Sequence, residues 1–514
     1  MGYALNAKSV EWNPSPERLR ELAARMPNAY RTEFGSIDVL TRVHARSKGS
    51  TYIVTDDPAS VTDQTVERAE LDRIAQLQDD YIRAQDMLVI DGYIGDDPAF
   101  RTRARLVIEA ANANIAGMQQ QLYFPGEWAH GEQPDSEPVT TVVYTPNLPV
   151  AGYPDERAIL VDLESNVTRV LNSDYFGESK KGGLRMWNNI VYERGGLALH
   201  AGCKVVPVDG DLKTVVIVGL SGTGKTTTTF REVLGSKPVQ DDFVALMPGG
   251  VVHGSEAGCF AKTFGLSADT EPEIYHATVQ PDAYLENVHV DGETGKVDFD
   301  DPEPTPNGRT TWPFTYVDPL PPREAPPASY LLILNRNQNI VPGVARLDRV
   351  QAAAYFMLGE TTGTSAGGAA EAGKSLRVPG TNPFFPRAHA DMGNRMLELL
   401  DSTDLQVFLL NTGWVGGGKD DEGSKKMTIA DSAAIVEGIV TGTIAWEADA
   451  DFGYDVAVSC PGISDHEKLQ PRRLYERTDR LGDYEQWVER FKRERKDYLA
   501  SYPGLHEEIV KSVL

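Results

Sequence analysis

The spacing of apolar residues predicts a mixed set of helices and strands in the first part of the chain. Ser15 is suited to cap a helix whose first turn holds Pro16, and this helix should run to about residue 26. Apolar residues three and four positions apart predict two longer helices, at residues 61–84 and 98–120. Short apolar runs bounded by Asp, Gly or Pro predict strands at residues 87–90, 141–144 and 159–161.

After about residue 195 the pattern changes to strands punctuated by glycine, and helices return later. The predicted strands are residues 197–206, 214–218, 243–246, 251–253 and 330–334. The predicted helices are residues 349–358, 390–400, 428–440 and 483–499. Strands mixed with helices in this way are typical of the α/β class. We therefore expect a two-lobed α/β protein, with a mixed α/β domain at residues 1–195 and a second domain at residues 196–514.

The composition indicates a folded and strongly acidic protein. Of its 514 residues, 75 are acidic and 50 are basic, which gives a formal net charge of −25, and 41% are apolar. This apolar content can form a core, whereas the charge opposes adhesion to nucleic acid or to an anionic membrane. The apolar runs are too short to span a bilayer, and the first ten residues lack the basic and apolar regions of a secretory leader. We expect a soluble protein with neither nucleic acid nor membrane as a partner.

Two residue counts suggest the surroundings in which the protein works. The three cysteines, Cys203, Cys259 and Cys460, are odd in number and far apart, which fits a reducing cytoplasm better than a disulfide framework. The chain has 18 lysines against 32 arginines, together with its surplus of Asp and Glu. A carboxylate-rich, lysine-poor surface suits a protein that stays hydrated in concentrated salt, so we expect a halophilic source.

A glycine-rich segment directly after a predicted strand carries the strongest chemical signal. It consists of Gly219, Leu220, Ser221, Gly222, Thr223, Gly224, Lys225 and Thr226. In a phosphate-binding loop (P-loop) of this pattern, glycines let backbone N–H groups converge on phosphate oxygens. The lysine reaches the β- and γ-phosphates, and the last hydroxyl can bind Mg²⁺. The segment therefore predicts that the second domain is a P-loop mononucleotide-binding domain.

Three further places in the sequence suit chemistry, and each has an alternative. Asp241 and Asp242 follow the loop at the place where P-loop proteins have a metal-binding carboxylate, and either could be that carboxylate. An acidic pair is also typical of a solvated turn. The pair Lys180 and Lys181, in a chain poor in lysine, suggests a task that needs an amine able to lose its proton. His200 lies in an apolar segment, where a core histidine bonded to the backbone is the alternative to a functional one.

Taken together, these motifs resemble the ATP-dependent phosphoenolpyruvate carboxykinases over residues 46–442. The order and the approximate spacing of many short motifs carry the resemblance, and no single motif does so alone. The motifs are Tyr175, residues 178–182, His200, residues 219–226, Asp241 and Asp242, residues 258–263, 271–275 and 285–288, Arg309, and residues 411–419.

The resemblance implies an enzyme of gluconeogenesis that converts oxaloacetate and ATP into phosphoenolpyruvate, ADP and CO₂. It implies that Lys181, His200 and Asp242 ligate a divalent metal ion, typically Mn²⁺ in this family. Arg46 is aligned with the arginine that binds the substrate carboxylate, a bidentate task that suits a planar guanidinium. Tyr175 and Lys180 are aligned with residues that line the site for oxaloacetate and phosphoenolpyruvate.

The resemblance also assigns the nucleotide site. It gives the glycine-rich loop to the triphosphate, with Lys225 on the transferred phosphoryl group and Thr226 on the Mg²⁺ of the nucleotide. Arg309 is aligned with the arginine that neutralises the γ-phosphoryl group as charge builds up. Lys262 is aligned with a residue near the phosphates and Glu271 with one near the ribose.

At the adenine the chain departs from the family pattern. The family has an arginine and a threonine there, and the aligned residues of this chain are Lys426 and Ser432. A lysine stacks on a purine less well than a guanidinium does, so the same reaction with another nucleotide, GTP, is an alternative.

The implied mechanism has two steps and uses Lys180, Lys181, Lys225 and Arg309 as catalytic residues. Oxaloacetate loses CO₂ and leaves the enolate of pyruvate, whose oxygen then attacks the γ-phosphorus of ATP in line. We expect the active cleft between the two domains, and we favour a monomer. Two rival functions are a P-loop serine kinase or phosphatase that acts on a protein, and a nucleotide sensor without catalysis.

Overall fold

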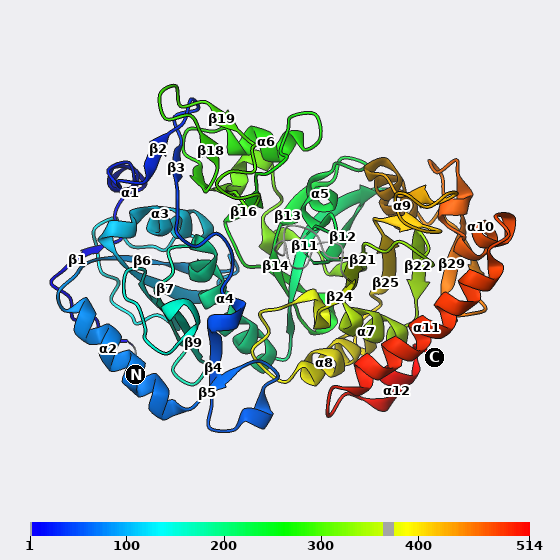
Figure 1. Cartoon of the computed structure of the whole chain (residues 1–514), viewed down its shortest axis with the longest axis horizontal. Coiled ribbons are helices and arrows are strands. Elements are labelled where there is room, and N and C mark those ends of the chain that lie inside the picture. Colours follow the sequence, from blue (N-terminus) through cyan, green and yellow to red (C-terminus); the bar gives the residue numbers. More distant parts are fainter. Residues whose placement is uncertain (1–2, 221, 363–374) are drawn as a thin grey trace. The chain divides into compact units, whose positions relative to one another are not determined.

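The chain forms two compact units. The computed structural model describes residues 3–220, 222–362 and 375–514, and its elements are labelled in Figure 1. Unit 1 consists of residues 1–194, 255–319 and 384–388, and unit 2 of residues 195–254, 320–383 and 389–514. A single division of the chain at residue 195, as the sequence suggested, is therefore too simple. Residues 255–319 return to unit 1 because three of their strands complete a sheet that the N-terminal segment begins.

The larger sheet of unit 1 has, among the described residues, eight strands in the order β1-β6-β7-β8-β10-β9-β4-β5. Their bounds are Ser9–Trp12 (β1), Asp86–Ile94 (β6), Thr102–Glu109 (β7), Thr140–Thr145 (β8), Val167–Leu171 (β10), Ala158–Asp162 (β9), Thr51–Val54 (β4) and Thr65–Val66 (β5). Helices cover both faces of this sheet. On one face Ile82 of α2 (Arg68–Ile82) packs with Val143 of β8, and on the other Gly182 of α4 (Phe176–Glu193) lies against the neighbouring Val142.

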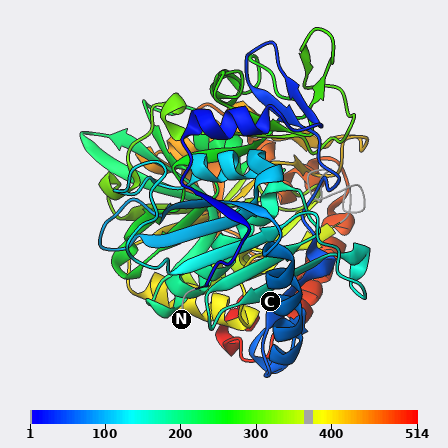
Figure 2. The same ribbon diagram turned by 90° about the vertical axis from the view of Figure 1, so that its left-hand side faces the viewer.

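Two further helices and a second sheet complete unit 1. Helix α1 (Pro16–Ala23) lies on α3 (Ala113–Leu122), which in turn packs on β6, as Figure 2 shows. The second sheet has the order β16-β20-β17-β3-β2, and helix α6 (Pro272–Thr278) lies beside it. Its strands, with the separate pair β18-β19, are Gly258–Lys262 (β16), Arg309–Pro313 (β20), Tyr284–Glu286 (β17), Ile37–Val39 (β3), Ala29–Arg31 (β2), His289–Val290 (β18) and Val297–Asp298 (β19).

Unit 2 is built on a sheet that has ten strands within the described ranges. Nine follow the order β15-β14-β11-β12-β21-β25-β22-β29-β28, and β13 pairs with β11. The strands are Leu197–Val208 (β11), Asp211–Val218 (β12), Lys237–Gln240 (β13), Phe243–Leu246 (β14), Val252–Gly254 (β15), Ala328–Asn335 (β21), Val344–Leu347 (β22), Gln406–Asn411 (β25), Ala445–Ala448 (β28) and Asp455–Ser459 (β29). Two short pairs are Glu360–Thr362 (β23) with Ser375–Arg377 (β24), and Trp414–Val415 (β26) with Lys425–Lys426 (β27).

The helices of unit 2 begin with α5, directly after β12, and continue toward the C-terminus. They are Lys225–Phe230 (α5), Arg349–Leu358 (α7), His389–Asp401 (α8), Ile429–Thr441 (α9), Pro471–Arg477 (α10), Leu481–Ala500 (α11) and Glu507–Lys511 (α12). Helix α9 packs its apolar side, including Ile435 and Ile439, against Ile217 of β12 and its neighbours. The core of unit 2 thus lies against the strand that precedes the glycine-rich loop.

The α/β class is confirmed, and most of the predicted elements are present. The predicted strands of the first half lie within β6, β8 and β9, and α7 has the predicted bounds. The helix at 98–120 is wrong in its first half, because residues 102–109 form strand β7. This strand is buried throughout, and Arg105 is accommodated there by an ion pair with Asp91 on the neighbouring strand. Its charged residues therefore do not mark a solvent-facing side.

Helix α4 was not predicted from the sequence. It contains Gly177, Gly182 and Gly183, and glycine lowers helix propensity by about 1 kcal/mol relative to alanine. A Cβ atom on Gly182 would lie 3.2 Å from Thr168 and from Val142 of the sheet. Gly182, one of the glycines that weaken the helix pattern, thus lets the helix approach the sheet closely.

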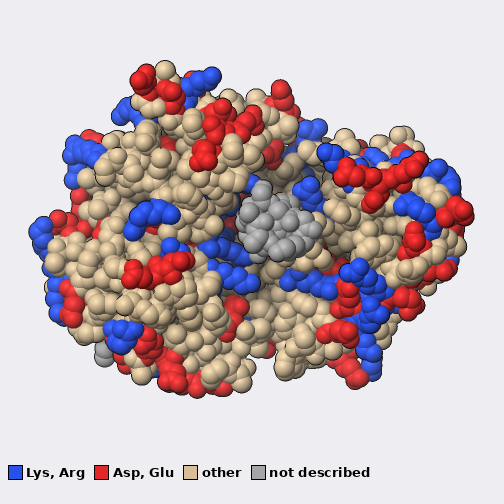
Figure 3. Space-filling model, viewed as in Figure 1, with Lys and Arg blue, Asp and Glu red and all other residues tan. Residues whose placement is uncertain are grey.

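The surface agrees with the acidic composition. Asp and Glu side chains are spread over many small patches of the face shown in Figure 3, with Lys and Arg side chains between them. Within the described part of the chain, none of the helices has both the length and the apolar content to span a bilayer. The halophilic source stays a prediction.

Candidate active site

The glycine-rich loop of unit 2 joins the end of β12 to the start of α5. Gly222 and Gly224 have φ values of 85° and 93°, a backbone conformation that glycine adopts without strain. Thr223 turns the loop back on itself by donating from its N and Oγ1 atoms to the carbonyl oxygen of Leu220. Gly219 has no room for a side chain, since a Cβ atom would lie 2.4 Å from Thr223 Oγ1. Ser221 lies outside the described residues.

Lys225, the first residue of α5, is tied to the end of strand β13. Its Nζ atom donates to the carbonyl oxygen of Asp241 at 2.9 Å and to Oδ1 of Asp242 at 2.8 Å. His200 of β11 approaches the same Oδ1 atom with Nε2 at 2.9 Å. The pairing of β11 with β14, which places His200 opposite Phe243, brings His200 and Asp242 together. Of the two aspartates, Asp242 is therefore the one whose carboxylate meets the loop lysine and the histidine.

The second ring nitrogen of His200 fixes its tautomer. Nδ1 lies 2.9 Å from the carbonyl oxygen of Thr381, and because a carbonyl only accepts, Nδ1 must donate. In the neutral ring Nε2 then carries a lone pair. His200 is buried but not an inert core residue, since its Nε2 atom is directed at a carboxylate.

A cavity of about 590 Å³ adjoins the glycine-rich loop within unit 2. Its volume lies within the range of about 300–1,000 Å³ that is typical of small-molecule sites. Gly222, Thr223 and Gly224 form part of its wall, and Lys426 and Ser432 line it as well. Its cationic residues are Lys204, Arg231, Arg336 and Lys426, whereas no Asp or Glu stands among the described residues that line it. The cavity is therefore suited to an anionic ligand.

Apolar side chains form another part of the same wall. They are Val233, Met427, Ile429, Ala433 and Val436. A cavity that combines a glycine-rich loop, cationic side chains and an apolar wall is suited to a nucleotide. Thr226 lies at the start of α5 and is half-buried.

In unit 1, the side chains of the adjacent lysines Lys180 and Lys181 of α4 lie beside different residues. Lys180 is buried and donates from Nζ to Glu256 Oε2 at 2.8 Å. The Nζ atom of Lys181 lies 4.6 Å from the centre of the Phe384 ring. Consecutive residues of a helix are rotated by about 100°, which separates the two ammonium groups. Lys180 therefore has a fixed carboxylate partner, and Lys181 belongs to a different cluster.

The first cluster of unit 1 surrounds the ring of Phe260, and we call it the Phe260 cluster. Lys180 Nζ lies 5.6 Å from the ring centre, Arg309 Cζ 5.2 Å, and the Tyr175 ring centre 6.3 Å. Burial raises the pKa of Tyr175, while the nearby Arg309 lowers it. The phenol of Tyr175 therefore stays protonated at neutral pH and is a hydrogen-bond donor.

The second cluster surrounds the ring of Phe384, and we call it the Phe384 cluster. Three cationic groups face this ring: Lys181 Nζ at 4.6 Å, Arg185 Cζ at 5.4 Å and Arg46 Cζ at 5.9 Å from its centre. Lys181 and Arg185 are four residues apart on α4 and so share one face of the helix. Residues from three distant parts of the chain thus form one positively charged group.

The segment that carries Arg46 is held by hydrogen bonds on both sides. Before it, the carbonyl oxygen of His44 accepts from Asn307 Nδ2 at 2.6 Å, and after it the N–H of Ser47 donates to Glu178 Oε1 at 2.6 Å. Asn307 also accepts from Arg309 at 2.9 Å through Oδ1. Asn307 therefore connects the Arg46 segment directly to Arg309.

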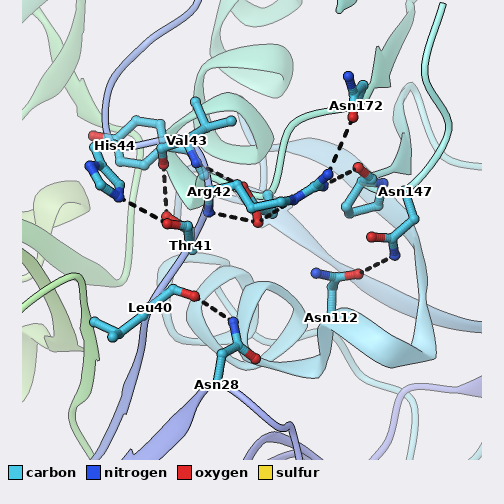
Figure 4. A network of polar contacts seen from close by, with 12 residues as sticks. Asn28, Leu40, Thr41, Arg42, Val43, His44, Asn112, Asn147 and Asn172 are labelled. Atoms are coloured by element: carbon cyan, nitrogen blue, oxygen red, sulfur yellow. Dashed lines mark hydrogen bonds and ion pairs between the residues drawn. The ribbon is translucent and has the colours of Figure 1, made fainter. Parts of the chain in front are cut away.

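Further polar contacts fix the same segment upstream, as Figure 4 shows. The hydroxyl of Thr41 donates to the carbonyl oxygen of Val43 at 2.7 Å, and His44 Nε2 lies 2.9 Å from the carbonyl oxygen of Thr41. The guanidinium of Arg42 contacts Asn172 and, with its own backbone N–H, the carboxylate of Asp174. A loop fixed in this way can hold an arginine for binding with little loss of entropy.

Arg309 lies between two charged residues in the second sheet of unit 1. In the strand register it stands opposite Lys262 on β16 and Glu286 on β17. Burial, and then the nearby Arg309, lower the pKa of Lys262. Burial also raises the pKa of Glu286 well above its usual range. Like charges directly opposite each other are unfavourable, so Lys262 and Arg309 together suit an anionic ligand.

The comparison with known proteins identifies the family. A family model described as phosphoenolpyruvate carboxykinase matches residues 8–466. The protein named phosphoenolpyruvate carboxykinase (ATP) of Aeropyrum pernix is 31% identical over 98% of this chain and 96% of its own length.

The chain belongs to the ATP-dependent phosphoenolpyruvate carboxykinase family. Two further relatives are phosphoenolpyruvate carboxykinase (ATP) 1 of Moorella thermoacetica and phosphoenolpyruvate carboxykinase (ATP) of a Methylobacterium species. Each is 29% identical, and they cover 93% and 90% of this chain and 91% and 87% of their own lengths. The resemblance of the sequence motifs to this carboxykinase family is thus confirmed, and the chain is an enzyme of the carboxy-lyase type.

The structure brings the predicted carboxykinase residues together in four groups. In unit 2, His200, Lys225 and Asp242 are in direct contact, and Lys426 and Ser432 share a cavity with the glycine-rich loop. In unit 1, the other predicted side chains fall into the Phe260 and Phe384 clusters, with Lys262 beside Arg309. Glu271 stands apart from these groups, half-buried directly before α6.

Sequence reasoning missed the residues that organise these groups. Phe260 and Phe384 form the centres of the two clusters, and Asn307 connects the segments of Arg46 and Arg309. Arg185 had a usable signal, since it stands four residues after Lys181 and therefore on the same helix face. The phenylalanines had none, because they come close to the cations only through the fold.

Proposed function

We propose that this chain converts oxaloacetate and ATP into phosphoenolpyruvate, ADP and CO₂, the gluconeogenic reaction of its family, with the nucleotide in unit 2 and the keto acid in unit 1. The observation that carries the nucleotide half is the cavity beside the glycine-rich loop, which is lined by cations although the chain has a net charge of −25. Negative phosphates are the ligand that such a wall favours.

In this proposal Lys225 exchanges its contact with Asp242 for a phosphate oxygen. The backbone of residues 219–226 cradles the triphosphate, and Thr226 binds the Mg²⁺ that accompanies it. Lys426 and Ser432 lie beside the base, and Glu271 contacts the ribose. Because Lys426 stands where the family has an arginine, GTP is a second candidate nucleotide.

The residues assigned to a divalent ion fit such an ion chemically. Carboxylate and imidazole donors suit Mn²⁺, and His200 Nε2 and Asp242 Oδ1 already lie 2.9 Å apart with the proton of the ring placed on Nδ1. Lys181 would be the third ligand, as its neutral amine. When bound, the ion supplies positive charge beside the oxygens of the keto acid.

The residues of unit 1 bind and orient the keto acid. Arg46 holds a carboxylate of oxaloacetate, and Tyr175, whose phenol stays protonated, donates to it a further hydrogen bond. Loss of CO₂ leaves the enolate of pyruvate, and Lys180 lies in the cluster that stabilises this negative charge. The enolate oxygen then attacks the γ-phosphorus of ATP, the bond to the β-phosphate oxygen breaks, and ADP leaves. Arg309 and Lys262 neutralise the charge on the transferred group.

An assay of ADP formation tests the proposal. We expect turnover that requires both oxaloacetate and Mn²⁺, and that falls by more than about 100-fold in Asp242→Asn, because the substitution removes a charged metal ligand. Asp211→Asn, at an exposed position on β12, serves as the control and should keep the wild-type rate.

Three results would contradict the proposal in different ways. Turnover that needs a protein acceptor would favour a serine kinase or phosphatase, and nucleotide binding without any turnover would favour a sensor. An Asp242→Asn enzyme with the full rate would exclude the assigned ligand set. Running the assay with ATP and with GTP decides which nucleotide the enzyme uses, and either result leaves the proposed reaction of oxaloacetate unchanged.

A further inference from the structure

The Phe384 cluster gathers three cationic side chains around one aromatic ring. Arg46, Lys181 and Arg185 face one ring, and the carboxylate that approaches them from α4 is that of Glu178. The ring itself offers only a weak interaction, about 0.5–2 kcal/mol for each cation.

Arg185 is the cation of this cluster that is both buried and incompletely hydrogen-bonded. Its exposed fraction is 5%, and its Nη1 atom has no hydrogen-bond partner in the described part of the chain. Glu178 Oε2 lies 3.6 Å from Nη1, which is too far for a hydrogen bond, and this oxygen also lacks a hydrogen-bond partner there. A buried guanidinium nitrogen without an acceptor is costly unless a ligand supplies one.

A second buried arginine of unit 1 shows what a purely structural arrangement looks like. Arg105 has the same exposed fraction of 5% and also faces an aromatic ring, with Cζ 5.0 Å from the centre of Trp12. Its Nε and Nη2 atoms donate to both oxygens of Asp91, at 2.9 and 3.4 Å. Arg105 is thus satisfied within the protein, whereas Arg185 is not.

The charge that surrounds Arg185 favours an anionic ligand rather than another protein group. Burial lowers the pKa of Arg185, and the nearby positive charge of Arg46 lowers it further. The carboxylates of Glu178 and of the exposed Asp63 act in the opposite direction and raise it. Arg46 is only half-buried, so an anion can reach the cluster from its side. The Arg46 segment is tied to α4 by the hydrogen bond from Ser47 N to Glu178, which keeps both arginines on the same side of the helix.

We propose that Arg185 is a second substrate-binding guanidinium, which binds a carboxylate group of the keto acid together with Arg46. The inference rests on the proposed function, because the carboxylate belongs to the substrate named there. Arg185 supplies hydrogen bonds to the anion and takes no part in proton transfer.

The test compares Arg185→Gln and Arg185→Lys with the matched pair Arg105→Gln and Arg105→Lys. For each protein one measures KM for oxaloacetate, KM for ATP, kcat and the melting temperature. Loss of a charge-assisted hydrogen bond predicts that Arg185→Gln raises KM for oxaloacetate by about 10- to 100-fold, while KM for ATP changes less than about twofold. Arg185→Lys should restore part of the affinity, because it keeps the charge but loses the bidentate geometry.

The control pair separates binding from folding. We expect the Arg105 variants to lower the melting temperature and to leave KM for oxaloacetate unchanged. The inference is overturned if the Arg185 variants behave in the same way, with a lower melting temperature and an unchanged KM for oxaloacetate.

Binding of malonate, a dicarboxylate probe, gives a readout that is independent of turnover. We expect it to raise the melting temperature of the wild type and to do so less in Arg185→Gln; an equal rise in both proteins would overturn the inference. A wild-type protein without oxaloacetate-dependent turnover would contradict the proposed function instead, and the malonate result would still decide the role of Arg185 in anion binding.

Discussion

The candidate cations of the two units are stabilised in opposite ways. In unit 2, Lys225 donates to two oxygens of the adjoining strand end, at 2.8 and 2.9 Å. In unit 1, Arg46, Lys181 and Arg185 gather around an aromatic ring, and one nitrogen of Arg185 lacks an acceptor. Lys225 is thus held by protein oxygens, whereas Arg185 has a nitrogen that an anionic substrate would supply with an acceptor. Substitutions in the two regions should therefore change different kinetic constants.

The largest effect is expected for Lys225→Met in unit 2. This change removes the cation assigned to the transferred phosphoryl group, so kcat should fall by about 100- to 1,000-fold. KM for oxaloacetate should change little, because that substrate is assigned to unit 1. Lys213→Met, on the strand before the loop, is the control and should keep the wild-type kcat. A Lys225→Met enzyme with more than a third of the wild-type kcat would contradict the assignment.

A smaller effect is expected for Asn307→Ala in unit 1. Asn307 joins the carbonyl oxygen of His44 to the guanidinium of Arg309, so its loss should misplace both Arg46, which is assigned to the keto acid, and Arg309, which is assigned to the transferred phosphoryl group. We expect kcat/KM for oxaloacetate to fall by about 10-fold, the equivalent of about 1.4 kcal/mol.

The control for this variant is Asn147→Ala. Asn147 donates to Glu109 and Asn112 in the same unit but contacts neither arginine segment (Figure 4). It should lower stability and leave kcat/KM unchanged. Equal losses of kcat/KM in both variants would mean that Asn307 acts only through the stability of unit 1.

The last effect is one on stability and not on turnover, and it concerns Lys204, which lines the cavity of unit 2. Its Nζ atom donates to the carbonyl oxygens of Thr228 and Arg231 and is fully buried, and this burial lowers its pKa from 10.5 to about 8. Between these pH values the unfolded chain binds more protons than the folded one, so the free energy of unfolding should rise with pH. Relative to Lys204→Met, the wild type should gain about 1–3 kcal/mol between pH 7.5 and 10.5. Denaturant titrations at the two pH values measure this difference; a constant or falling difference would contradict the lowered pKa.

The same contrast explains how much of the site could be predicted from the sequence. The glycine-rich loop is encoded within eight consecutive residues, and its spacing alone indicates a turn between a strand and a helix. The Phe384 cluster combines residues 46, 181, 185 and 384, whose proximity depends on the whole of unit 1. Lys181 and Arg185 share one face of a helix, so local spacing could predict only that these two residues of the cluster lie close together.

The fold shows the same division between local and non-local information. Helix α7 has its predicted bounds, and both of its ends are set locally: Asp348 and Gln351 form a capping box, and Gly359 ends the helix. Strand β7 was taken for a helix because its charged side chains are compensated by neighbouring strands that the local pattern does not show. The return of residues 255–319 to unit 1 was missed for the same reason, since it follows from the pairing of β17 with β3, whose residues are more than 200 positions apart.

Titration of the protein with Mn²⁺ in the absence of nucleotide, followed by electron paramagnetic resonance, tests whether Lys181 is a metal ligand. Lys180→Arg is the matched control, because Lys180 is the neighbouring lysine and is paired with Glu256. A guanidinium stays protonated and cannot ligate a cation, so Lys181→Arg should weaken Mn²⁺ binding by at least about 100-fold, while Lys180→Arg stays within about threefold of the wild type. If Lys181→Arg binds Mn²⁺ as tightly as the wild type, Lys181 is not a ligand and the proposed metal site is wrong.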